Sequence, residues 1–154
     1  METIENIKTD EGYRAEPYIC SEGKLTWLYG RNIDDRPITE NEWANLKLIL
    51  YAGGDLKQWA DCLFSQEVTL VDSDLLALGF NRIMHTDNVS NIVLNMAYNM
   101  GVTKFNPKKW PKFFKALADK DYKEAAEQMK DSRWYGQVGR RSGRLYKAML
   151  ALGE

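Results

Sequence analysis

Hydrophobic residues recur along most of the chain at intervals of three and four, the spacing of one face of a helix. This spacing predicts a short helix over residues 3–11, a last helix over about 140–152, and helices between them that open near Thr39, Leu56, Asp72, Thr86, Pro111 and Asp121. Between Tyr13 and about Asp35, glycines punctuate short runs in which apolar and polar residues alternate. This part of the chain therefore predicts a small antiparallel sheet.

Several residues mark where the predicted helices begin and end. Gly12 is a natural helix stop, and Thr39 with Glu42 forms a capping box at a helix start. The pair Gly53-Gly54 interrupts or kinks the helix that follows this cap. Asp72 resembles the N-terminal cap of a further helix that runs to about residue 83.

The order of these elements predicts a mostly helical α+β fold in a single domain over residues 1–154. The helix near 89–100 is apolar on nearly every face, so we expect it at the centre of a helical lobe over about 86–154. The N-terminal helix 3–11 belongs to this lobe. The sheet forms a small lobe over about 12–38, and helices over about 39–85 join the two. A cleft between the lobes is the expected place for a substrate.

Composition allows a core and argues against some partners. The chain has 154 residues, 44% of them hydrophobic, which suits one domain with a core of its own. Its formal net charge of −1 argues against bulk binding of nucleic acid. Two basic stretches, Lys104–Lys115 and Arg133–Lys147, are either solvated helical faces or a means of attraction to an anionic polymer such as a bacterial wall.

The N-terminus and the cysteines indicate where the protein is made. The first residues lack the apolar core of a signal peptide, and no apolar run approaches the ~20 residues of a membrane span. Cys20 and Cys62 are too few for a disulfide framework, so we expect both to be free thiols. We therefore expect a soluble protein in a reducing cytoplasm.

The sequence lacks the residues that most other classes of enzyme need for catalysis. A metal hydrolase usually recruits several His or Cys side chains, but His85 is the only histidine, and we expect it to cap a helix end. A Cys–His nucleophile pair would need His85 to approach Cys20 or Cys62, and the sequence gives no sign of this. No glycine-rich nucleotide loop is present, because Gly53-Gly54 has no Lys-Ser/Thr after it.

One acid has a suggestive setting. Glu11 ends the first predicted helix, and Cys20 and Thr26 follow it after eight and then five intervening residues. Strand alternation puts Thr26 on the face opposite Leu25 and Trp27. An exposed glutamate at a helix end is usually inert, but the returning strands bring polar groups towards this one. Glycoside hydrolysis needs such an acid on one side of a bond and a water-positioning group on the other.

These residues are similar to those of a known family. The run Asp10-Glu11-Gly12, followed by Tyr18, Cys20, Glu22-Gly23, Thr26 and Gly30, resembles the T-even phage lysozymes, glycoside hydrolase family 24. The segments LNMAYNMG at 94–101 and EAAEQMKDSRWYGQ at 124–137 resemble later segments of that family in the same order. The resemblance covers nearly the whole chain and is weak over residues 31–87. It implies a two-lobed lysozyme-like fold, with a three-stranded sheet in the small lobe and a helical C-terminal lobe.

The resemblance also implies an activity and a set of residues. It implies a phage endolysin, a muramidase that cleaves the β(1→4) bond between N-acetylmuramic acid and N-acetylglucosamine with inversion, using no metal or cofactor. Glu11 is the implied general acid, with a raised pKa, Thr26 holds the attacking water, and Cys20 completes the catalytic set. Arg141 is implied against Glu11, and Asp10 and Arg144 as a supporting ion pair. The implied substrate-binding residues are Glu22, Gly30, Asn32, Tyr98, Asn99, Phe113, Gln128 and Gln137.

Two positions leave the mechanism open. The family uses either Asp or Cys at the position of Cys20, and a free thiol, with a pKa of about 8.5, is mostly neutral at neutral pH. We hypothesise that Cys20 acts as a thiolate, favoured by Arg14 and Arg31 nearby in the sequence. Arg31 stands where the family commonly has His. Both departures favour the alternative of a non-catalytic peptidoglycan-binding relative, and a peptidoglycan amidase is a third interpretation.

Partners and location follow from the same resemblance. Peptidoglycan is the implied substrate, and we expect a monomer that neither binds nucleic acid nor inserts into a membrane. The enzyme would wait in the host cytoplasm until a holin-type membrane pore releases it for host cell lysis. It would then act on the periplasmic cell wall.

Overall fold

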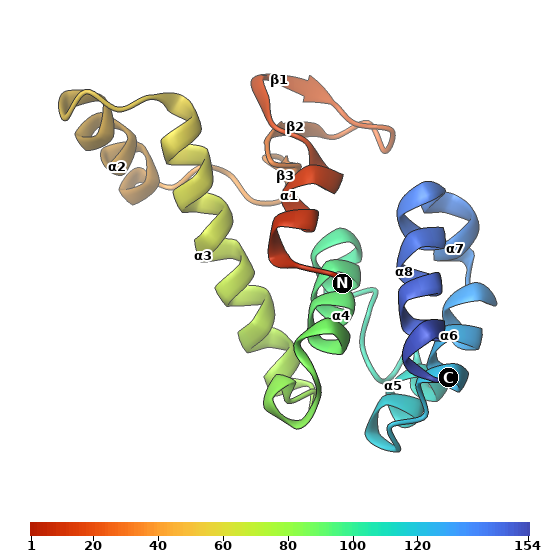
Figure 1. Ribbon diagram of the computed structural model, residues 1–154. Coiled ribbons are helices and arrows are strands. Elements are labelled where there is room, and N and C mark those ends of the chain that lie inside the picture. Colours follow the sequence, from red (N-terminus) through yellow and green to blue (C-terminus); the bar gives the residue numbers. More distant parts are fainter. The chain divides into compact units, whose positions relative to one another are not determined.

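The computed structural model describes all 154 residues, which form eight α-helices, one short 3-10 helix and a three-stranded sheet (Figure 1). The α+β class, mostly helical with a small antiparallel sheet, is confirmed. The chain divides into two compact units. Residues Lys8–Thr69 form one, here the sheet unit, and residues Met1–Ile7 with Leu70–Glu154 form the other, here the helical unit. The lobe boundaries and the cleft between lobes stay predictions.

The sheet unit is built on three short antiparallel strands. It contains the end of α1 (Ile4–Glu11), β1 (Arg14–Ile19), β2 (Leu25–Leu28), β3 (Arg31–Asn32), α2 (Glu40–Tyr51) and the first part of α3 (Leu56–Ala77). The strands lie in the order β1-β2-β3. Gly12, with φ of 72°, ends α1, and the capping box of Thr39 and Glu42 opens α2, both as predicted. The pair Gly53-Gly54 separates α2 from α3 as a break.

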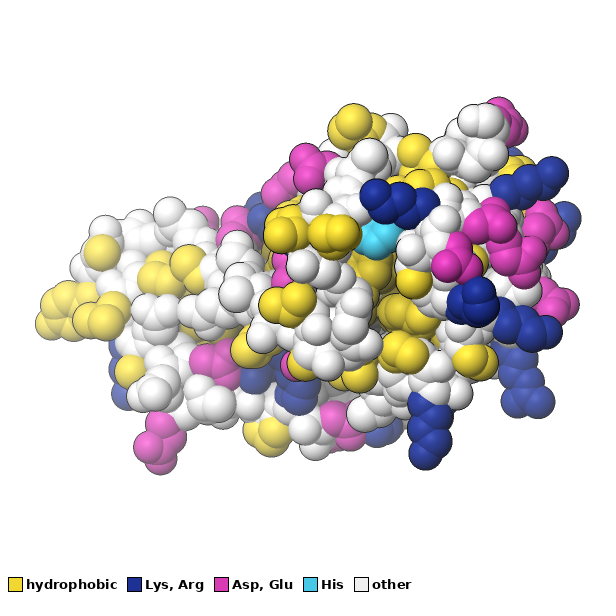
Figure 2. Space-filling view, turned by 90° about the horizontal axis from the view of Figure 1, so that it is seen from below, with side chains coloured by type: hydrophobic (Ala, Val, Ile, Leu, Met, Phe, Trp, Pro, Cys, Tyr) yellow, Lys and Arg dark blue, Asp and Glu magenta, His cyan; other side chains and the backbone are white.

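Three indole rings join β2, α2 and α3 in the sheet unit. The ring centroids of Trp27, Trp43 and Trp59 lie 5.5 to 6.1 Å apart, and Trp59 is completely buried. Its Nε1 donates a hydrogen bond of 3.0 Å to the carbonyl oxygen of Glu42, which fixes α3 against the start of α2. The outer face of α2 is apolar as well, and Figure 2 shows hydrophobic side chains protruding at the left, on the side where Figure 1 places α2.

The helical unit packs around one buried helix. It contains the rest of α3, the 3-10 helix η1 (Arg82–Met84), α4 (Asp87–Met100), α5 (Pro111–Ala118), α6 (Tyr122–Lys130), α7 (Arg133–Val138) and α8 (Arg140–Leu152). Every residue of α4 from Val89 to Ala97 except Asn91 is buried, as its nearly all-round apolar pattern predicts. Helix α8 packs against α4, α6 and α7, and α5 packs against α6. No helix of the protein has both the length and the apolar composition needed to cross a bilayer.

The prediction that Asp72 opens a new helix is wrong. Helix α3 continues unbroken from Leu56 to Ala77 and ends before Gly79, whose φ is 99°. Val68 and Leu75 are both buried and lie two turns apart, so one apolar stripe continues past Asp72. Burial of this stripe outweighs the capping tendency, and the Asp72 carboxylate instead pairs with Arg82 at 2.6 Å.

Two further differences concern short helices. The stretch that includes Ile83, expected to continue an α-helix, forms the three-residue helix η1, and Ile83 is exposed. Helix α7 was not predicted at all. The Ser132 side chain accepts from the Tyr135 backbone N–H and caps α7, but six residues are too few to show a helical period in the sequence.

Candidate active site

Glu11 is the last residue of α1, so its carboxylate leaves the helix where the chain turns into the sheet. The turn between β2 and β3 lies directly against it. A Cβ placed on Gly30 would overlap Oε2 of Glu11, and Gly30 itself has φ of 73°, in the left-handed region. Position 30 must therefore lack a side chain for Glu11 to occupy its place. Gly30 is predicted to bind substrate, and in the structure it leaves the space that the Glu11 carboxylate occupies.

Asp61 on α3 holds both the turn that contains Gly30 and the helix that ends at Glu11. Its Oδ1 accepts a hydrogen bond of 2.6 Å from the Tyr29 hydroxyl and pairs with Lys8 Nζ at 3.1 Å. Tyr29 directly precedes Gly30, and Lys8 lies about one turn before Glu11. Burial disfavours the charge of Asp61, but the bonds to Tyr29 and Lys8 outweigh burial and hold its pKa below the ordinary value. The sequence carries no motif that would have singled out Asp61.

Thr26 lies at the centre of the sheet. It pairs with Tyr18 of β1 on one side and with Asn32 of β3 on the other. Directly paired residues point to the same face, so these three side chains form one row. Burial, and then the charge of Glu11, raise the pKa of Tyr18. The charge of Glu11 therefore acts on a residue of this row.

Cys20 lies at the turn of the β1–β2 hairpin. Its backbone N–H donates to the carbonyl oxygen of Lys24, and its own carbonyl accepts from Gly23, both at 2.9 Å. The backbone N–H groups of Lys24 and Glu22, and then the Thr26 hydroxyl, hydrogen-bond the sulfur and lower the pKa of Cys20 from 9.0. Oγ1 of Thr26 also lies 3.0 Å from the Lys24 carbonyl oxygen. The hairpin therefore favours the thiolate and connects Cys20 to Thr26.

The expectation that Arg14 and Arg31 favour the thiolate is wrong. The Arg14 guanidinium lies over the Tyr18 ring, 4.2 Å from its centroid. Arg31 is 7% exposed and donates to both carboxylate oxygens of Glu42, at 2.5 and 2.8 Å, with Glu67 at 3.5 Å. Neither arginine is among the groups that shift the pKa of the thiol. Arg31 instead holds β3 to α2 and α3.

The remaining predicted residues of the sheet unit surround the same hairpin. Asn32 donates to Oδ2 of Asp35 at 2.9 Å and accepts from its backbone N–H at 3.1 Å. Asp34 accepts from the Leu25 backbone N–H at 2.8 Å, so both aspartates hold the end of the sheet. Glu22 is exposed on the hairpin turn.

The two predicted arginines belong to α8 in the helical unit. Arg141 Nε donates to Oδ1 of Asn95 at 2.7 Å, and Asn95 is completely buried. Arg144 donates from Nη2 and Nε to the Glu2 carboxylate, at 2.9 and 3.1 Å. Glu2 is itself buried, and nothing in the sequence singled it out. The implied contacts of these arginines with residues 10 and 11 would join the two units and stay predictions.

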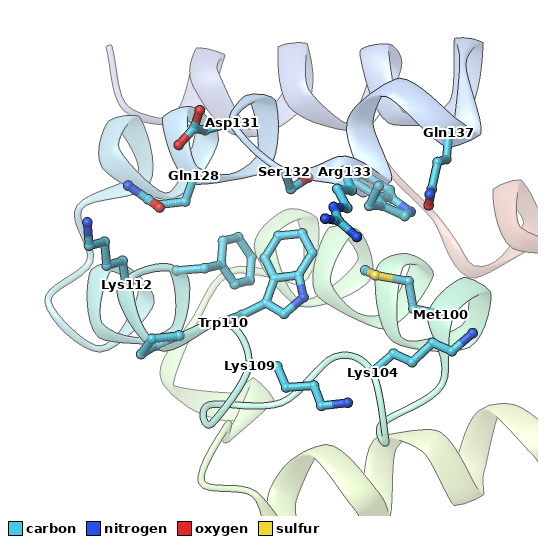
Figure 3. Close-up of a pocket in the computed structure, with 13 residues that line it drawn as sticks. Met100, Lys104, Lys109, Trp110, Lys112, Gln128, Asp131, Ser132, Arg133 and Gln137 are labelled. Atoms are coloured by element: carbon cyan, nitrogen blue, oxygen red, sulfur yellow. The ribbon is translucent and has the colours of Figure 1, made fainter.

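A groove of about 620 Å³ in the helical unit gathers three of the predicted substrate-binding residues (Figure 3). Phe113 of α5, Gln128 of α6 and Gln137 of α7 all line it. Asn99 does not line the groove itself, but its Oδ1 accepts a hydrogen bond of 2.8 Å from Nε1 of Trp134, which does. Tyr98 is not among the lining residues.

Two tryptophans of this groove were missed. Trp110 lies in the middle of Figure 3, and its ring meets those of Phe105, Phe113 and Trp134 edge-on, with centroids 5.3 to 6.4 Å apart. Trp134 belongs to a segment that carries the family resemblance, but large aromatics at helical spacing usually belong to a core. The sequence therefore gave no reason to place either ring at a surface groove.

His85 ends a helix, as expected, because it is the C-cap of η1 and its backbone N–H donates to the carbonyl oxygen of Arg82 at 3.2 Å. Its ring stacks on Phe80 with centroids 4.9 Å apart, and Nδ1 lies 2.9 Å from the Tyr122 hydroxyl. Burial, and then the charge of Lys120, lower the pKa of His85. Both cysteines are free thiols, as expected. No three His, Cys, Asp or Glu side chains come together as a metal site requires.

A helix that presents a glutamate to a small antiparallel sheet, in an otherwise helical chain, defines a lysozyme-like protein. The sequence comparisons agree. The chain belongs to the phage lysozyme family, whose profile matches residues 8–148. It is also similar to a protein of Dictyostelium discoideum described as probable T4-type lysozyme 2, with 27% identity over 157 residues that cover 90% of this chain and 88% of that protein. Family membership supports a lysozyme function, and hence a glycoside hydrolase.

Proposed function

We propose that the chain is a muramidase that hydrolyses the β(1→4) bond between N-acetylmuramic acid and N-acetylglucosamine in bacterial peptidoglycan. Membership of the phage lysozyme family supports the reaction class. The observation that carries the choice of residues is the position of Glu11, which ends α1 against Gly30, in the turn between β3 and the strand β2 that contains Thr26. All these residues belong to the sheet unit.

In this proposal Glu11 is protonated and gives its proton to the glycosidic oxygen as the bond from that oxygen to C1 breaks. A water held by the Thr26 hydroxyl attacks C1 from the opposite face, which inverts the anomeric centre. Cys20, as the thiolate, accepts the proton that this water loses. The hydrogen bonds that lower the pKa of Cys20 support this role. Exchange with solvent then returns both groups to their starting states.

Arg141 is proposed as the partner of Glu11 before substrate binds. A guanidinium beside a carboxyl lowers its pKa, which opposes the role of an acid. The contact must therefore loosen on binding, or desolvation by the sugar must outweigh it. Asn95 supports a fixed place for Arg141, since it accepts from Nε at 2.7 Å.

The biological role is proposed as that of a phage endolysin. The enzyme would remain in the host cytoplasm until a holin-type pore admits it to the periplasmic wall, and it would act as a monomer. Eight residues are proposed to contact the polymer, three in the sheet unit (Glu22, Gly30, Asn32) and five in the helical unit (Tyr98, Asn99, Phe113, Gln128, Gln137).

The alternative of a non-catalytic wall-binding relative has lost one of its two supports. Arg31, which departs from the residue common in the family, is explained by its bonds to Glu42 in the interior of the sheet unit. Cys20 is the other support, and the hydrogen bonds that lower its pKa increase the fraction that is present as the thiolate, compared with an ordinary thiol.

The test compares Glu11→Gln with Glu16→Gln in a turbidity assay on permeabilised Gram-negative cells. Glu16 is an exposed residue of β1 in the same unit, so it controls for the loss of one carboxylate. Loss of a general acid should lower the clearing rate by about 100-fold or more, and the control should clear like the wild type. Normal clearing by Glu11→Gln would refute the assignment.

Product analysis of digested peptidoglycan identifies the bond. The wild type should release new reducing ends on N-acetylmuramic acid, first as the α anomer. Reducing ends on N-acetylglucosamine, or new amino groups without reducing ends, would contradict a muramidase. Binding to the wall without any product would favour the non-catalytic alternative.

A further inference from the structure

A second hollow in the helical unit lies between the end of α3 and helix α5, here the α3–α5 hollow. Apolar side chains form most of its wall, among them Phe80, Pro107, Phe114 and Leu117. Its volume of about 320 Å³ is close to the lower limit of ligand pockets in proteins, so it suits a small molecule. None of the residues proposed for catalysis or for contact with the polymer lines it. The hollow is therefore a separate candidate site for an apolar ligand.

His85 lines this hollow and offers it one unused hydrogen-bonding atom. The ring is held by its stack on Phe80 and by the 2.9 Å contact between Nδ1 and the Tyr122 hydroxyl. Tyr122 has no other hydrogen-bond partner and burial raises its pKa, so the hydroxyl keeps its proton and donates it to Nδ1. The ring proton is then on Nε2, which has no partner and is not fully enclosed. A ligand can satisfy Nε2 only with an acceptor atom.

The charges around the hollow favour an anion as this acceptor. No acid lines the hollow, and Lys115, which does, is already compensated by Asp119 at 2.9 Å. Lys120 forms no ion pair, and its charge acts on the His85 ring. In Figure 2 the one histidine, in cyan, has hydrophobic side chains around it and a dark blue cationic side chain beside it. One free cation and one donor suit a singly charged group better than a phosphate.

The backbone of Lys120 supports a role for its side chain. The residue follows α5 with φ of 55°, in the left-handed region where Gly or Asn is the usual choice. Its backbone N–H donates to the carbonyl oxygen of Leu117 at 3.0 Å and closes the end of the helix. A lysine gains nothing from this conformation and adds strain to it. The charge that it brings to the hollow is the property that Gly or Asn would lack.

We propose that the α3–α5 hollow binds a small aliphatic carboxylate. The hydrocarbon chain would lie among Phe80, Phe114 and Leu117, and the carboxylate would accept from Nε2 of His85 and face Lys120. Burial of the chain supplies most of the affinity, and the donor and the cation select an anion over a neutral alcohol. The proposal does not rest on the proposed muramidase activity, since the two sites have no residue in common.

The test uses NMR, because His85 is the only histidine and its ring signals therefore need no assignment. The wild-type protein is titrated with octanoate, octanol and octyl phosphate, and the midpoint of His85 is measured with and without saturating octanoate. Ala118→Leu fills the hollow from an exposed position of its lining. Lys120→Asn removes the charge with a residue that tolerates the left-handed backbone. Lys123→Asn is the matched control, since Lys123 is exposed in the same unit outside the hollow.

Octanoate should shift the His85 ring signals in a saturable way and raise the midpoint, because a nearby anion favours the charged ring. Octanol should bind about tenfold more weakly, since hydrogen bonds to a charged group are stronger than neutral ones. Lys120→Asn should bind octanoate about threefold more weakly, as expected for one exposed charge, without a fall in Tm. Lys123→Asn should bind like the wild type, and Ala118→Leu should lose affinity for octanoate and octanol alike.

Equal affinities for octanoate and octanol would overturn the choice of an anion, and tighter binding of octyl phosphate would overturn the choice of a carboxylate. A midpoint of His85 that stays unchanged at saturation would show that the carboxylate does not reach Nε2. Full binding by Ala118→Leu, or equal losses in Lys120→Asn and Lys123→Asn, would refute the hollow as the site.

Discussion

Replacing Gly30 by alanine should remove the activity of the enzyme while its fold persists. The residue has φ of 73°, and a Cβ there would overlap Oε2 of Glu11 and lie 3.1 Å from its Cδ. The backbone of this turn is held from one side by the 2.6 Å bond between Tyr29 and Asp61. The carboxylate at the end of a flexible side chain, rather than the turn, therefore has to move.

Two effects set the magnitude. A left-handed backbone costs an L-residue about 1–2 kcal/mol, so the free energy of unfolding should fall by roughly that amount and the Tm by roughly 2–8 °C. Displacing a reacting group by about 1 Å can cost about 100-fold in rate. We therefore expect a modest loss of stability and a loss of kcat/KM of about 100-fold.

Gly53→Ala is the matched control. Gly53 lies in the same unit with φ of 86°, and a Cβ there would meet nothing within 4 Å. This variant should lose as much stability through its backbone yet clear permeabilised cells at the wild-type rate. Urea unfolding and turbidity are measured on both variants at a temperature where both are folded. Equal clearing by the two variants would show that the position of the Glu11 carboxylate beside Gly30 does not matter for catalysis.

Three further predictions concern titrating groups. Hydrogen bonds from Arg31 lower the pKa of Glu42 from 4.5 to about 2. The stability that this carboxylate contributes is present above pH 4.5 and should be lost as the pH falls towards 2, by at most about 3 kcal/mol. Urea titrations of Glu42→Gln should lack this loss. The rate of alkylation of Cys20 should rise with pH with a midpoint below pH 9.0. Cys20→Asp should keep the activity that Cys20→Ser loses, and full activity of the serine variant would remove the thiolate from the mechanism. A titration followed by NMR should give His85 a midpoint below pH 6.5, because burial lowers its pKa. The stability linked to the neutral ring is present above pH 6.5 and is lost as the pH falls through the pKa of the folded state. A midpoint at or above pH 6.5 would contradict the burial of the ring.

Local signals in the sequence were sufficient where a few neighbouring residues decide the structure. Gly12 ends α1, the box of Thr39 and Glu42 opens α2, and Pro111 opens α5, each within one turn of the residue that causes it. The buried helix α4 was also predictable, because its apolar residues occupy nearly all faces. The spacing of Glu11, Cys20 and Thr26 placed all three near one sheet for the same reason, since a short helix and a hairpin leave little freedom.

Long-range pairing explains what the sequence did not show. Asp72 resembles a cap when read locally, but its partner Arg82 and the buried stripe of α3 decide its role. Asp61 resembles any surface acid, and only the fold brings Lys8 and Tyr29 to it. Each interaction joins residues that no short pattern relates.

The β1–β2 hairpin, more than the chemistry of the side chain, explains how a cysteine can replace an aspartate at position 20. Backbone N–H groups of Lys24 and Glu22 hydrogen-bond the sulfur of Cys20, and such donors stabilise any anion at that place, whether carboxylate or thiolate. They matter more for a thiol, because its neutral form is a weak acceptor and its ordinary pKa lies above neutral pH. A hairpin that already holds its donors in position therefore tolerates either residue.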